Sequence, residues 1–386
     1  MGKVALIGPT DRSIWYFRRG LIKSLVERGF SVYVICNPGE YVTSIQNLGA
    51  ICVPVFMYRF MDFRKDIKYL WSLYRIFLKH KFDFIHTFTI KPNVFGSIAG
   101  RFAGIRRIYA LVEGLGFGYS EESGFKPWLS RQFFLMLYRL ASLSITKIWF
   151  INQDDKDLFE KKKIIKSSNA VFIRSIGVDL EEYSLQAVEP EVVKALRHEL
   201  GEGRDNLLYV TMVARMIWSK GVKEFVEAAN ILSSRHPNAR FLLVGEIQAD
   251  SPQSVPEDYL KFMLPPNVRW LNFRTDIPAL LAASDIVVLP SYYREGVPRS
   301  LLEGMAMGKP LVTTDYPGCR EVVKDGYNGY LVPIRDAKAL AEAISHLLSD
   351  SELRAKMGYA GREWAEREFD EKYVVARVLH ELYGLE

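Results

Sequence analysis

Two glutamates, Glu295 and Glu303, stand seven residues apart in the segment Glu295-Gly-Val-Pro-Arg-Ser-Leu-Leu-Glu303. The apolar run 284–290 before them predicts a buried parallel strand, and Pro298 suits the first turn of a following helix. Glu295 would then lie at the carboxyl end of the strand, where doubly wound sheets bind ligands, with Glu303 about one turn into the helix. The spacing therefore predicts two hydrogen-bond acceptors that face the hydroxyl groups of one ligand.

The start of this helix is also a candidate anion site. The free backbone N–H groups of Arg299 and Ser300 would point out of the helix N-terminus, where a phosphate is stabilised. Acidic residues near a helix start also have a purely structural explanation, because they complement the helix dipole. Neighbouring motifs decide between the two interpretations.

Two cations, Arg215 and Lys220, follow another predicted strand in Val213-Ala-Arg-Met-Ile-Trp-Ser-Lys-Gly221. At the carboxyl end of a strand and near the next helix, they are placed to hold a diphosphate. They would supply the counter-charge of a leaving nucleoside diphosphate. The alternative is two surface cations without a ligand, and their pairing with Glu295 and Glu303 makes that alternative the weaker one.

Alternating apolar runs and helical patterns must position these residues. The strands predicted in the first half are Val4–Ile7, Ser31–Ile35, Ile51–Val55, Phe84–His86, Arg107–Val112, Lys147–Ile151 and Ala170–Ile173. The helical patterns are Ser13–Arg28, Asp66–Lys79, Asn93–Ala103 and Pro127–Ser142. The strands predicted in the second half are Asn206–Ala214, Arg240–Val244, Asn267–Leu271, Asp285–Leu289 and Pro310–Thr313. We expect an α/β protein of two facing Rossmann-like domains with a cleft between them.

The length of 386 residues also favours two domains. The predicted boundaries are 1–176 for an acceptor-binding domain, 177–204 for a hinge region and 205–369 for a donor-binding domain. The final helical segment, 370–386, is expected to pack back on one of the two domains, and we favour the acceptor-binding domain.

Composition is that of a globular protein, with 49% hydrophobic and 25% charged residues. Three scattered cysteines, Cys36, Cys52 and Cys319, predict neither a disulfide framework nor a zinc site. The chain opens on a strand-like run without a signal-peptide pattern, and no apolar run approaches ~18 residues. We expect a cytoplasmic protein.

These motifs resemble those of the retaining glycosyltransferases of the GT-B fold, and more narrowly of family 4, which uses nucleotide sugars. The donor-half resemblance lies in Arg215, Lys220, Phe273-Arg-Thr-Asp-Ile277, Glu295–Glu303, Gly308-Lys-Pro310, Gly318-Cys-Arg-Glu321 and Asn328-Gly-Tyr-Leu-Val-Pro333. In the first half, Phe84–Asn93 and Leu111–Phe117 most resemble the subgroup that adds sugars to polyprenyl-diphosphate-linked saccharides.

The resemblance implies a role for each charged residue of the donor half. Arg215 and Lys220 would hold the diphosphate, Glu303 the ribose hydroxyls, and Glu295 the transferred sugar. Because the two cations neutralise the leaving group, we expect no metal and no other cofactor.

Further donor contacts follow from the same resemblance. The backbone that would touch sugar and phosphate is that of Val297, Pro298, Arg299 and Ser300. The base would lie near Phe273 and Arg274. Gly8 would approach the diphosphate from the first domain, although Pro9 removes one N–H donor there.

Two residues of the first half are candidates for catalysis. His86 ends a predicted strand and would face the cleft and hydrogen-bond sugar or acceptor, unless it is a structural histidine. Glu113 stands where many relatives carry a histidine. It would either orient the acceptor hydroxyl or accept its proton, or else cap the glycine loop that follows.

The first half is also basic. The segment 58–82 carries seven Lys and Arg against two Asp, and 101–150 carries seven against three Glu. In 63–79 the predicted apolar stripe is Leu70, Leu73, Tyr74, Phe77 and Leu78, and the cations on another face are Arg64, Lys68, Arg75 and Lys79. A second aromatic and basic pattern covers 125–150. Such helices either contact an anionic membrane or cover a sheet.

The sequence therefore predicts a retaining, metal-independent glycosyltransferase that is peripheral on the inner face of the cell membrane. It would move a sugar from a nucleotide sugar, UDP-HexNAc or UDP-hexose, to a polyprenyl-diphosphate-linked saccharide in surface polysaccharide or glycan assembly. One alternative is the same chemistry on a soluble or protein acceptor. Another is a sugar-nucleotide binding protein without catalysis, which the complete set of charged residues argues against. A basic nucleic-acid-binding protein is less favoured, because no motif of that class is present, and we expect no nucleic-acid partner.

Overall fold

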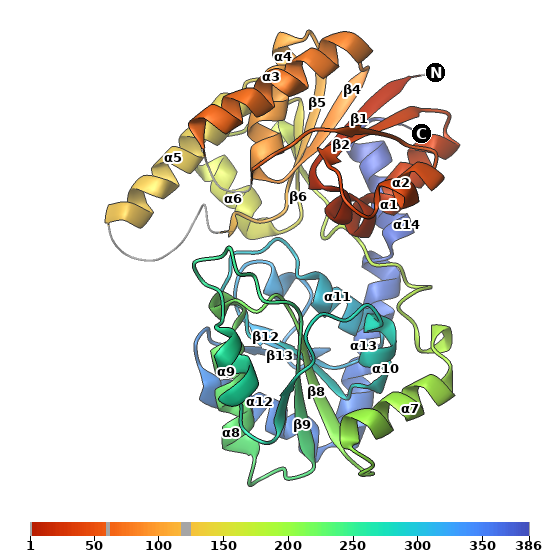
Figure 1. Cartoon of the computed structure of the whole chain (residues 1–386), viewed down its shortest axis with the longest axis vertical. Helices are drawn as coiled ribbons and strands as arrows, with labels where there is room; N and C mark the ends of the chain where they lie inside the picture. The colour runs from red at the N-terminus through yellow and green to blue at the C-terminus, as the bar shows by residue number, and fades with distance from the viewer. Residues whose placement is uncertain (1, 59–61, 117–124, 386) are drawn as a thin grey trace. The chain divides into compact units, whose positions relative to one another are not determined.

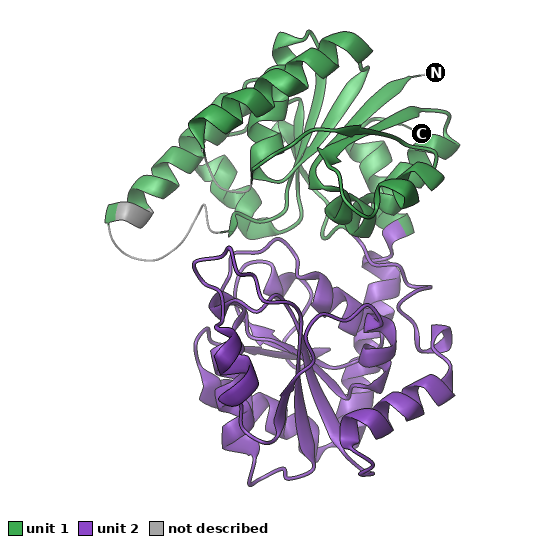
Figure 2. Cartoon of the chain, viewed as in Figure 1, with its two compact units in different colours: residues 1–176, 372–386 green, residues 177–371 purple. Residues whose placement is uncertain are grey.

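The computed structural model describes residues 2–58, 62–116 and 125–385, and the chain divides into two α/β units (Figures 1 and 2). The first unit consists of residues 1–176 and 372–386, and the second of residues 177–371. The segment 177–204 thus belongs to the second unit, and the last fifteen residues return to the first.

The first unit is built on seven parallel strands in the order β3-β2-β1-β4-β5-β6-β7. The strands are β1 (Lys3–Thr10), β2 (Ser31–Asn37), β3 (Ile51–Pro54), β4 (Phe84–Phe88), β5 (Arg107–Val112), β6 (Lys147–Phe150) and β7 (Ala170–Phe172). The helices are α1 (Asp11–Glu27), α2 (Val42–Asn47), α3 (Phe63–His80), α4 (Ser97–Phe102), α5 (Phe125–Ser142) and α6 (Gln153–Lys161). The segment predicted as one helix at 93–103 is a π-helical turn, η1 (Pro92–Gly96), followed by α4.

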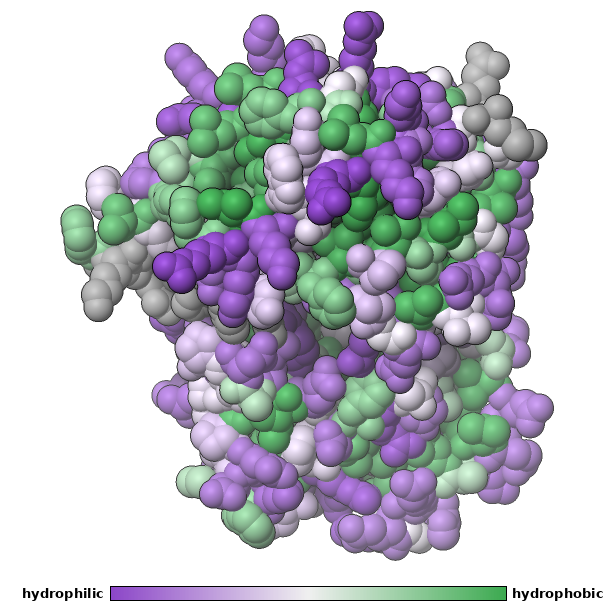
Figure 3. Space-filling view, turned by 45° about the horizontal axis from the view of Figure 1, so that its top comes forward, coloured by the Kyte–Doolittle hydropathy of each residue, from purple (hydrophilic) through white to green (hydrophobic). Residues whose placement is uncertain are grey.

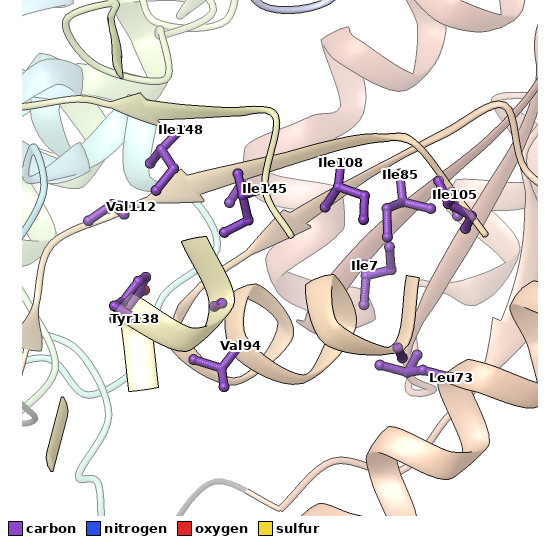
Figure 4. Close-up of a cluster of buried hydrophobic side chains, with 14 of the residues drawn as sticks. Ile7, Leu73, Ile85, Val94, Ile105, Ile108, Val112, Tyr138, Ile145 and Ile148 are labelled. Carbon is purple, nitrogen blue, oxygen red and sulfur yellow. The ribbon is translucent and has the colours of Figure 1, made fainter. Parts of the chain in front are cut away.

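The core of this unit lies between the sheet and its helices. Figure 4 shows Ile7, Ile85 and Ile108 from neighbouring strands packing with Leu73 of α3 and Val94 of η1. Local signals fix the helix starts, because Thr10 and Ser13 form a capping box on α1 and the Asp62 carboxylate accepts from the backbone N–H of Lys65 at α3.

Asn93 connects the sheet to α5. Its buried amide donates to the carbonyl of Leu111 at 2.7 Å and to the hydroxyl of Tyr138 at 3.2 Å, and it accepts from Thr87 at 2.8 Å. A single side chain therefore joins β4, β5 and α5 beside the carboxyl ends of the two strands.

The C-terminal segment completes the first unit. It contains α14 (Glu371–Arg377) and a π-helical turn, η7 (Val378–Leu382), where the sequence predicted one helix. The ring of Tyr383 lies 4.8 Å from that of Phe84 and 5.0 Å from that of Tyr109, and Lys147 donates to the carbonyl of Glu381 at 2.6 Å.

The second unit has six parallel strands in the order β10-β9-β8-β11-β12-β13. The strands are β8 (Leu208–Val213), β9 (Ala239–Val244), β10 (Val268–Trp270), β11 (Ile286–Leu289), β12 (Leu311–Thr314) and β13 (Gly329–Val332). The helices are α7 (Pro190–Gly201), α8 (Val222–Leu232), α9 (Glu257–Phe262), α10 (Ile277–Ala283), α11 (Arg299–Ala306), α12 (Ala337–Ser349) and α13 (Ser351–Glu368). The prediction of two Rossmann-like domains is confirmed, while the short edge strand β13 was not predicted.

Each sheet has one position where the strand order reverses. It falls between β1 and β4 in the first unit and between β8 and β11 in the second. In open parallel sheets the crevice outside the carboxyl ends of such strands is the usual place for a ligand. The residues that follow these strands are therefore the first to consider.

Candidate functional site

Lys220 and Glu295 meet at the reversal point of the second sheet. Lys220 lies on a 3₁₀ turn, η5 (Trp218–Lys220), after β8, and Glu295 lies in the loop between β11 and α11. Their side chains form an ion pair, and Ser291 donates a second hydrogen bond to Glu295 at 2.7 Å. Lys220 is only 7% exposed, and burial lowers its pKa while the Glu295 carboxylate opposes that shift.

Gly221 makes this pairing sterically feasible. Its φ is +85°, and a Cβ at this position would lie 2.2 Å from the carbonyl oxygen of Pro290. The backbone after η5 thus packs directly against the end of β11, which brings Lys220 beside the Glu295 loop.

Arg215 lies beside the same pair. The ring centroid of Tyr293 is 5.8 Å from the Arg215 guanidinium carbon and 5.7 Å from Lys220 Nζ, so one aromatic ring serves both cations. Arg215 also donates to the side-chain oxygen of Gln248. Sequence reasoning missed Tyr293 and Gln248, because nothing in the pattern of either segment indicates which distant cation it will contact.

Glu303 has a cation of its own. Arg299 Nε donates to Glu303 Oε1 at 2.8 Å, one turn earlier on α11, and Tyr183 supplies a further hydrogen bond. Burial raises the pKa of Glu303, and Arg299 and then Tyr183 oppose that shift. Tyr183 was not predicted as a site residue.

The predicted backbone contacts lie at the start of α11. Pro298 is the N-cap, one residue before the helix, rather than a residue of its first turn as we expected. Its φ of −64° and ψ of 118° make it extended, so the helix begins at Arg299. Val297 and Pro298 are buried, while Arg299 and Ser300 are partly exposed.

The residues predicted to meet the base lie after β10. The Phe273 side chain is 44% exposed, and Arg274 is held by two hydrogen bonds to Asp276, at 2.8 and 2.5 Å. A cavity of about 500 Å³ lies beside them, with Trp270 and Asn272 among its lining residues.

The glycine segment of the first unit is an ordinary part of the fold. Gly8 lies within β1, and the Asp11 carboxylate accepts from the backbone N–H of Tyr41 at 2.8 Å. Asp11 therefore holds the loop after β2 to the start of α1, and no contact of Gly8 with a diphosphate follows from these bonds.

His86 does not present its ring to solvent, contrary to the expectation that it faces a ligand. It is fully buried in β4, and its Nδ1 lies 2.5 Å from the hydroxyl of Tyr383. Burial, and after it the Arg18 charge, lowers the pKa of His86 well below the usual value. The side chain is a neutral part of the core.

Glu113 directly follows β5 and keeps 21% of its side chain exposed. It forms an ion pair with Arg18 of α1, whose side chain is 3% exposed. Arg18 was not predicted, although a signal existed. It occupies the buried face of α1 with Ile14, Leu21 and Leu25, where a charge needs a partner.

The two basic helices of the first unit have a broad apolar outer face. The large apolar side chains that are exposed on α3 are Phe63, Ile67, Trp71 and Leu78, and those on α5 are Phe125, Trp128, Leu129, Phe133, Met136 and Leu140. Arg64, Lys68, Arg75 and Lys79 are also exposed, whereas Leu73 and Phe77 of the predicted stripe face the core. Within the parts of the chain that the structure describes, no helix is long and apolar enough to cross a bilayer.

Comparison with known proteins places this geometry in a family. The model of glycosyl transferases group 1 matches residues 197–364, and that of glycosyltransferase family 4 matches residues 19–182. Two Rossmann-like α/β units, each with a parallel sheet, are the GT-B architecture. The chain belongs to family 4 of the GT-B glycosyltransferases.

Among similar curated proteins is a Campylobacter jejuni enzyme, N,N'-diacetylbacillosaminyl-diphospho-undecaprenol alpha-1,3-N-acetylgalactosaminyltransferase. It is 33% identical over 98% of this chain and 97% of its own length. The Escherichia coli UDP-Gal:alpha-D-GlcNAc-diphosphoundecaprenol alpha-1,3-galactosyltransferase is 28% identical over 84% of this chain and 81% of its own. Anabaena HepE, solved with UDP-glucose, has the same fold, with a TM-score of 0.83, 21% identity and full coverage of both chains.

Proposed function

We propose that this glycosyltransferase transfers a sugar from a UDP-sugar to a polyprenyl-diphosphate-linked saccharide, with retention of anomeric configuration. The observation that carries the proposal is the Lys220–Glu295 pair at the reversal point of the second sheet, with Arg215 beside it. A carboxylate next to two clustered cations suits a ligand that joins sugar hydroxyls to a diphosphate.

In this mechanism the donor's diphosphate binds Arg215 and Lys220, and Glu295 accepts hydrogen bonds from hydroxyls of the transferred sugar. The bond between the anomeric carbon and the diphosphate oxygen breaks as the acceptor oxygen attacks on the same face. The acceptor proton passes to the departing diphosphate oxygen. The two cations stabilise the charge that develops on the leaving group, so the step requires no metal.

The rest of the donor would follow α11 and β10. Glu303 would bind the ribose hydroxyls, and the backbone at 297–300 would contact sugar and phosphate. The base would enter the cavity beside Trp270 and Asn272, next to Phe273 and Arg274.

The relatives' names support the donor and acceptor classes. The Escherichia coli relative is named for UDP-Gal, and the Campylobacter relative for N-acetylgalactosaminyl transfer. Both are named for saccharides on diphosphoundecaprenol. A UDP-hexose or UDP-HexNAc and a polyprenyl-diphosphate acceptor are accordingly the classes we propose.

The outer faces of α3 and α5 would bring the enzyme to such an acceptor. Apolar side chains on each helix recur every three or four residues, as in 63, 67 and 71, with exposed cations between them. Figure 3 shows apolar surface over the left of the first unit, where α3 and α5 lie in Figure 1. An amphipathic surface of this kind fits the interface of an anionic membrane, and we propose a peripheral location there.

A panel of nucleotide sugars tests the transfer. Each donor is incubated with a polyprenyl-diphosphate-sugar acceptor, with and without EDTA, and nucleoside diphosphate release and lipid mass are measured. We expect one UDP-sugar to lengthen the lipid, at the same rate in EDTA, with an α-anomeric product by NMR. Tight UDP binding without lengthening of any lipid would contradict the acceptor class.

Charge reversal tests the membrane proposal. Replacing Arg75 and Lys79 by glutamate should reduce co-sedimentation with anionic vesicles, because each cation near such a surface contributes roughly 1 kcal/mol. Replacing Lys356 and Arg367 of α13 in the second unit provides a control of equal charge change. Equal loss in both variants would indicate non-specific attraction.

A further inference from the structure

We propose that Arg18 and Glu113 form the subsite for the attacking hydroxyl of the acceptor, with Glu113 as the group that orients the hydroxyl and Arg18 as its positioning residue. This inference depends on the proposed transfer to a saccharide acceptor. It goes beyond that proposal because it gives the first unit a specific chemical role and assigns one to a residue within α1.

The location of the pair supports the proposal. α1 follows β1, and Glu113 follows β5, which neighbours β4 on the far side from β1. The Arg18 guanidinium carbon lies 4.3 Å from the ring centroid of Phe88, the last residue of β4. Arg18 thus extends across the reversal point of the first sheet and reaches Glu113 on the other side.

The burial of the two partners is unequal. Arg18 is almost fully buried, whereas a fifth of the Glu113 side chain is open to solvent. The ion pair engages one carboxylate oxygen, Oε1. Because a carboxylate offers about four hydrogen-bonding positions, Glu113 retains acceptor capacity for a hydroxyl group. A partly exposed carboxylate suits the hydroxyl of an uncharged sugar better than a phosphate, whose negative charge it would repel.

The electrostatics favour orientation over proton abstraction. A guanidinium in contact with a carboxylate stabilises the ionised form and lowers its affinity for a proton. Glu113 would therefore accept a hydrogen bond from the attacking hydroxyl and fix its orientation in the acceptor subsite. The proton leaves with the diphosphate oxygen, as in the proposed mechanism, so atoms and charges balance without Glu113 changing its protonation state.

Two buried titratable groups near Arg18 are His86 of β4 and Tyr383 of the C-terminal segment, and the Arg18 charge acts to lower the pKa of each. They form a hydrogen bond with each other and are fully buried. As neutral groups they add no charge that opposes the action of Arg18 on Glu113.

The experiment compares Arg18→Met, Arg18→Lys and Glu113→Gln in the full chain, with a UDP-sugar donor and a lipid-linked acceptor. We expect Arg18→Met and Glu113→Gln to lower kcat/KM for the acceptor by about 10- to 100-fold, the loss of one charge-assisted hydrogen bond. Arg18→Lys should recover most of the activity.

Two measurements separate this inference from the proposed function. The Kd of UDP should be unchanged in all three variants, since the donor groups lie in the second unit, and thermal unfolding checks that each variant folds. Lys23→Met removes an exposed cation from the same helix and should leave acceptor kinetics unchanged.

Several outcomes would overturn the inference. One is normal acceptor kinetics in Arg18→Met, with wild-type transfer intact. Another is a loss of about 1,000-fold or more in Glu113→Gln, which would make Glu113 the base. Failure of the wild type to use any lipid-linked acceptor would instead contradict the proposed function.

Discussion

The reversal points of the two sheets carry the same kind of ion pair in different surroundings. In the second unit Lys220 and Glu295 lie beside another cation, Arg215, on loops that follow the strands. In the first unit the cation is Arg18, inside a helix and against an aromatic ring. The strand topology supplies the position of a site, and the residues after each strand decide its ligand. Clustered cations suit a diphosphate, whereas a single cation paired with a partly exposed carboxylate suits a hydroxyl group.

The largest expected effect is at the diphosphate end of this comparison. Lys220→Ala should lower kcat/KM for the donor by about 100- to 1,000-fold, because it removes a buried donor from the site where leaving-group charge develops. Steady-state kinetics with varied UDP-sugar measure the loss. Lys223→Ala, which removes an exposed lysine of α8, is the matched control. If both variants lost kcat/KM for the donor to a similar extent, a specific role of Lys220 in binding the diphosphate would be contradicted.

The outer surfaces differ as well. Trp128 and Leu129 are adjacent exposed residues of α5 in the first unit, and Phe262 and Met263 are an equivalent pair at the end of α9 in the second. Replacing the first pair by serine should weaken partitioning onto anionic vesicles by about 30-fold, from the apolar area no longer buried in lipid. The second pair should change partitioning little. If both replacements weakened partitioning equally, the outer surface of the first unit would have no special affinity for the membrane.

Burial of His86 makes the stability of the first unit depend on pH. The folded-state pKa of His86 is lowered by burial, so the unfolded chain binds a proton that the native state does not. Stability is therefore lost as pH falls below about 6.5, with about 1.4 kcal/mol lost by pH 5.5. Denaturant unfolding of wild type and His86→Asn across this range measures the difference, and parallel pH profiles would contradict the assignment.

The smallest expected effect is at the ribose end of the donor site. Tyr183→Phe should raise the Kd of UDP about fivefold, because Glu303 loses a hydrogen bond that orients it. Binding of 2'-deoxy-UDP should weaken less, since it has fewer hydroxyls for Glu303. Tyr359→Phe removes another tyrosine–glutamate hydrogen bond, 3.1 Å long, to Glu363 on the surface of α13, and it should change the binding of neither ligand. If Tyr183→Phe weakened the binding of both ligands equally, the proposal that Glu303 binds the ribose hydroxyls would be contradicted.

The sequence predicted the sheets better than the contacts at their edges. Buried parallel strands are continuous apolar runs, so Arg107–Val112 was predicted with its observed bounds. β13 was missed because it is a short edge strand that opens on glycine. Lys220 and Glu295 were each predicted to follow a strand, but their ion pair was not, because only the observed strand order shows that the two strands are neighbours. Tyr293, Gln248 and Tyr183 were missed because their partners lie on other segments, and periodicity carries no information about such pairings.

The return of residues 372–386 to the first unit has a consequence for how the protein is made and engineered. The Tyr383 ring packs on β4 and β5, and Arg107 donates to the Tyr383 carbonyl, so the first unit is completed by a segment that is synthesised only after the second unit. The N-terminal half would wait, incompletely buried, until synthesis has passed the entire second unit. In hybrid proteins that exchange the second unit between relatives, residues 372–386 should accordingly come from the same protein as the first unit, because they pack against it.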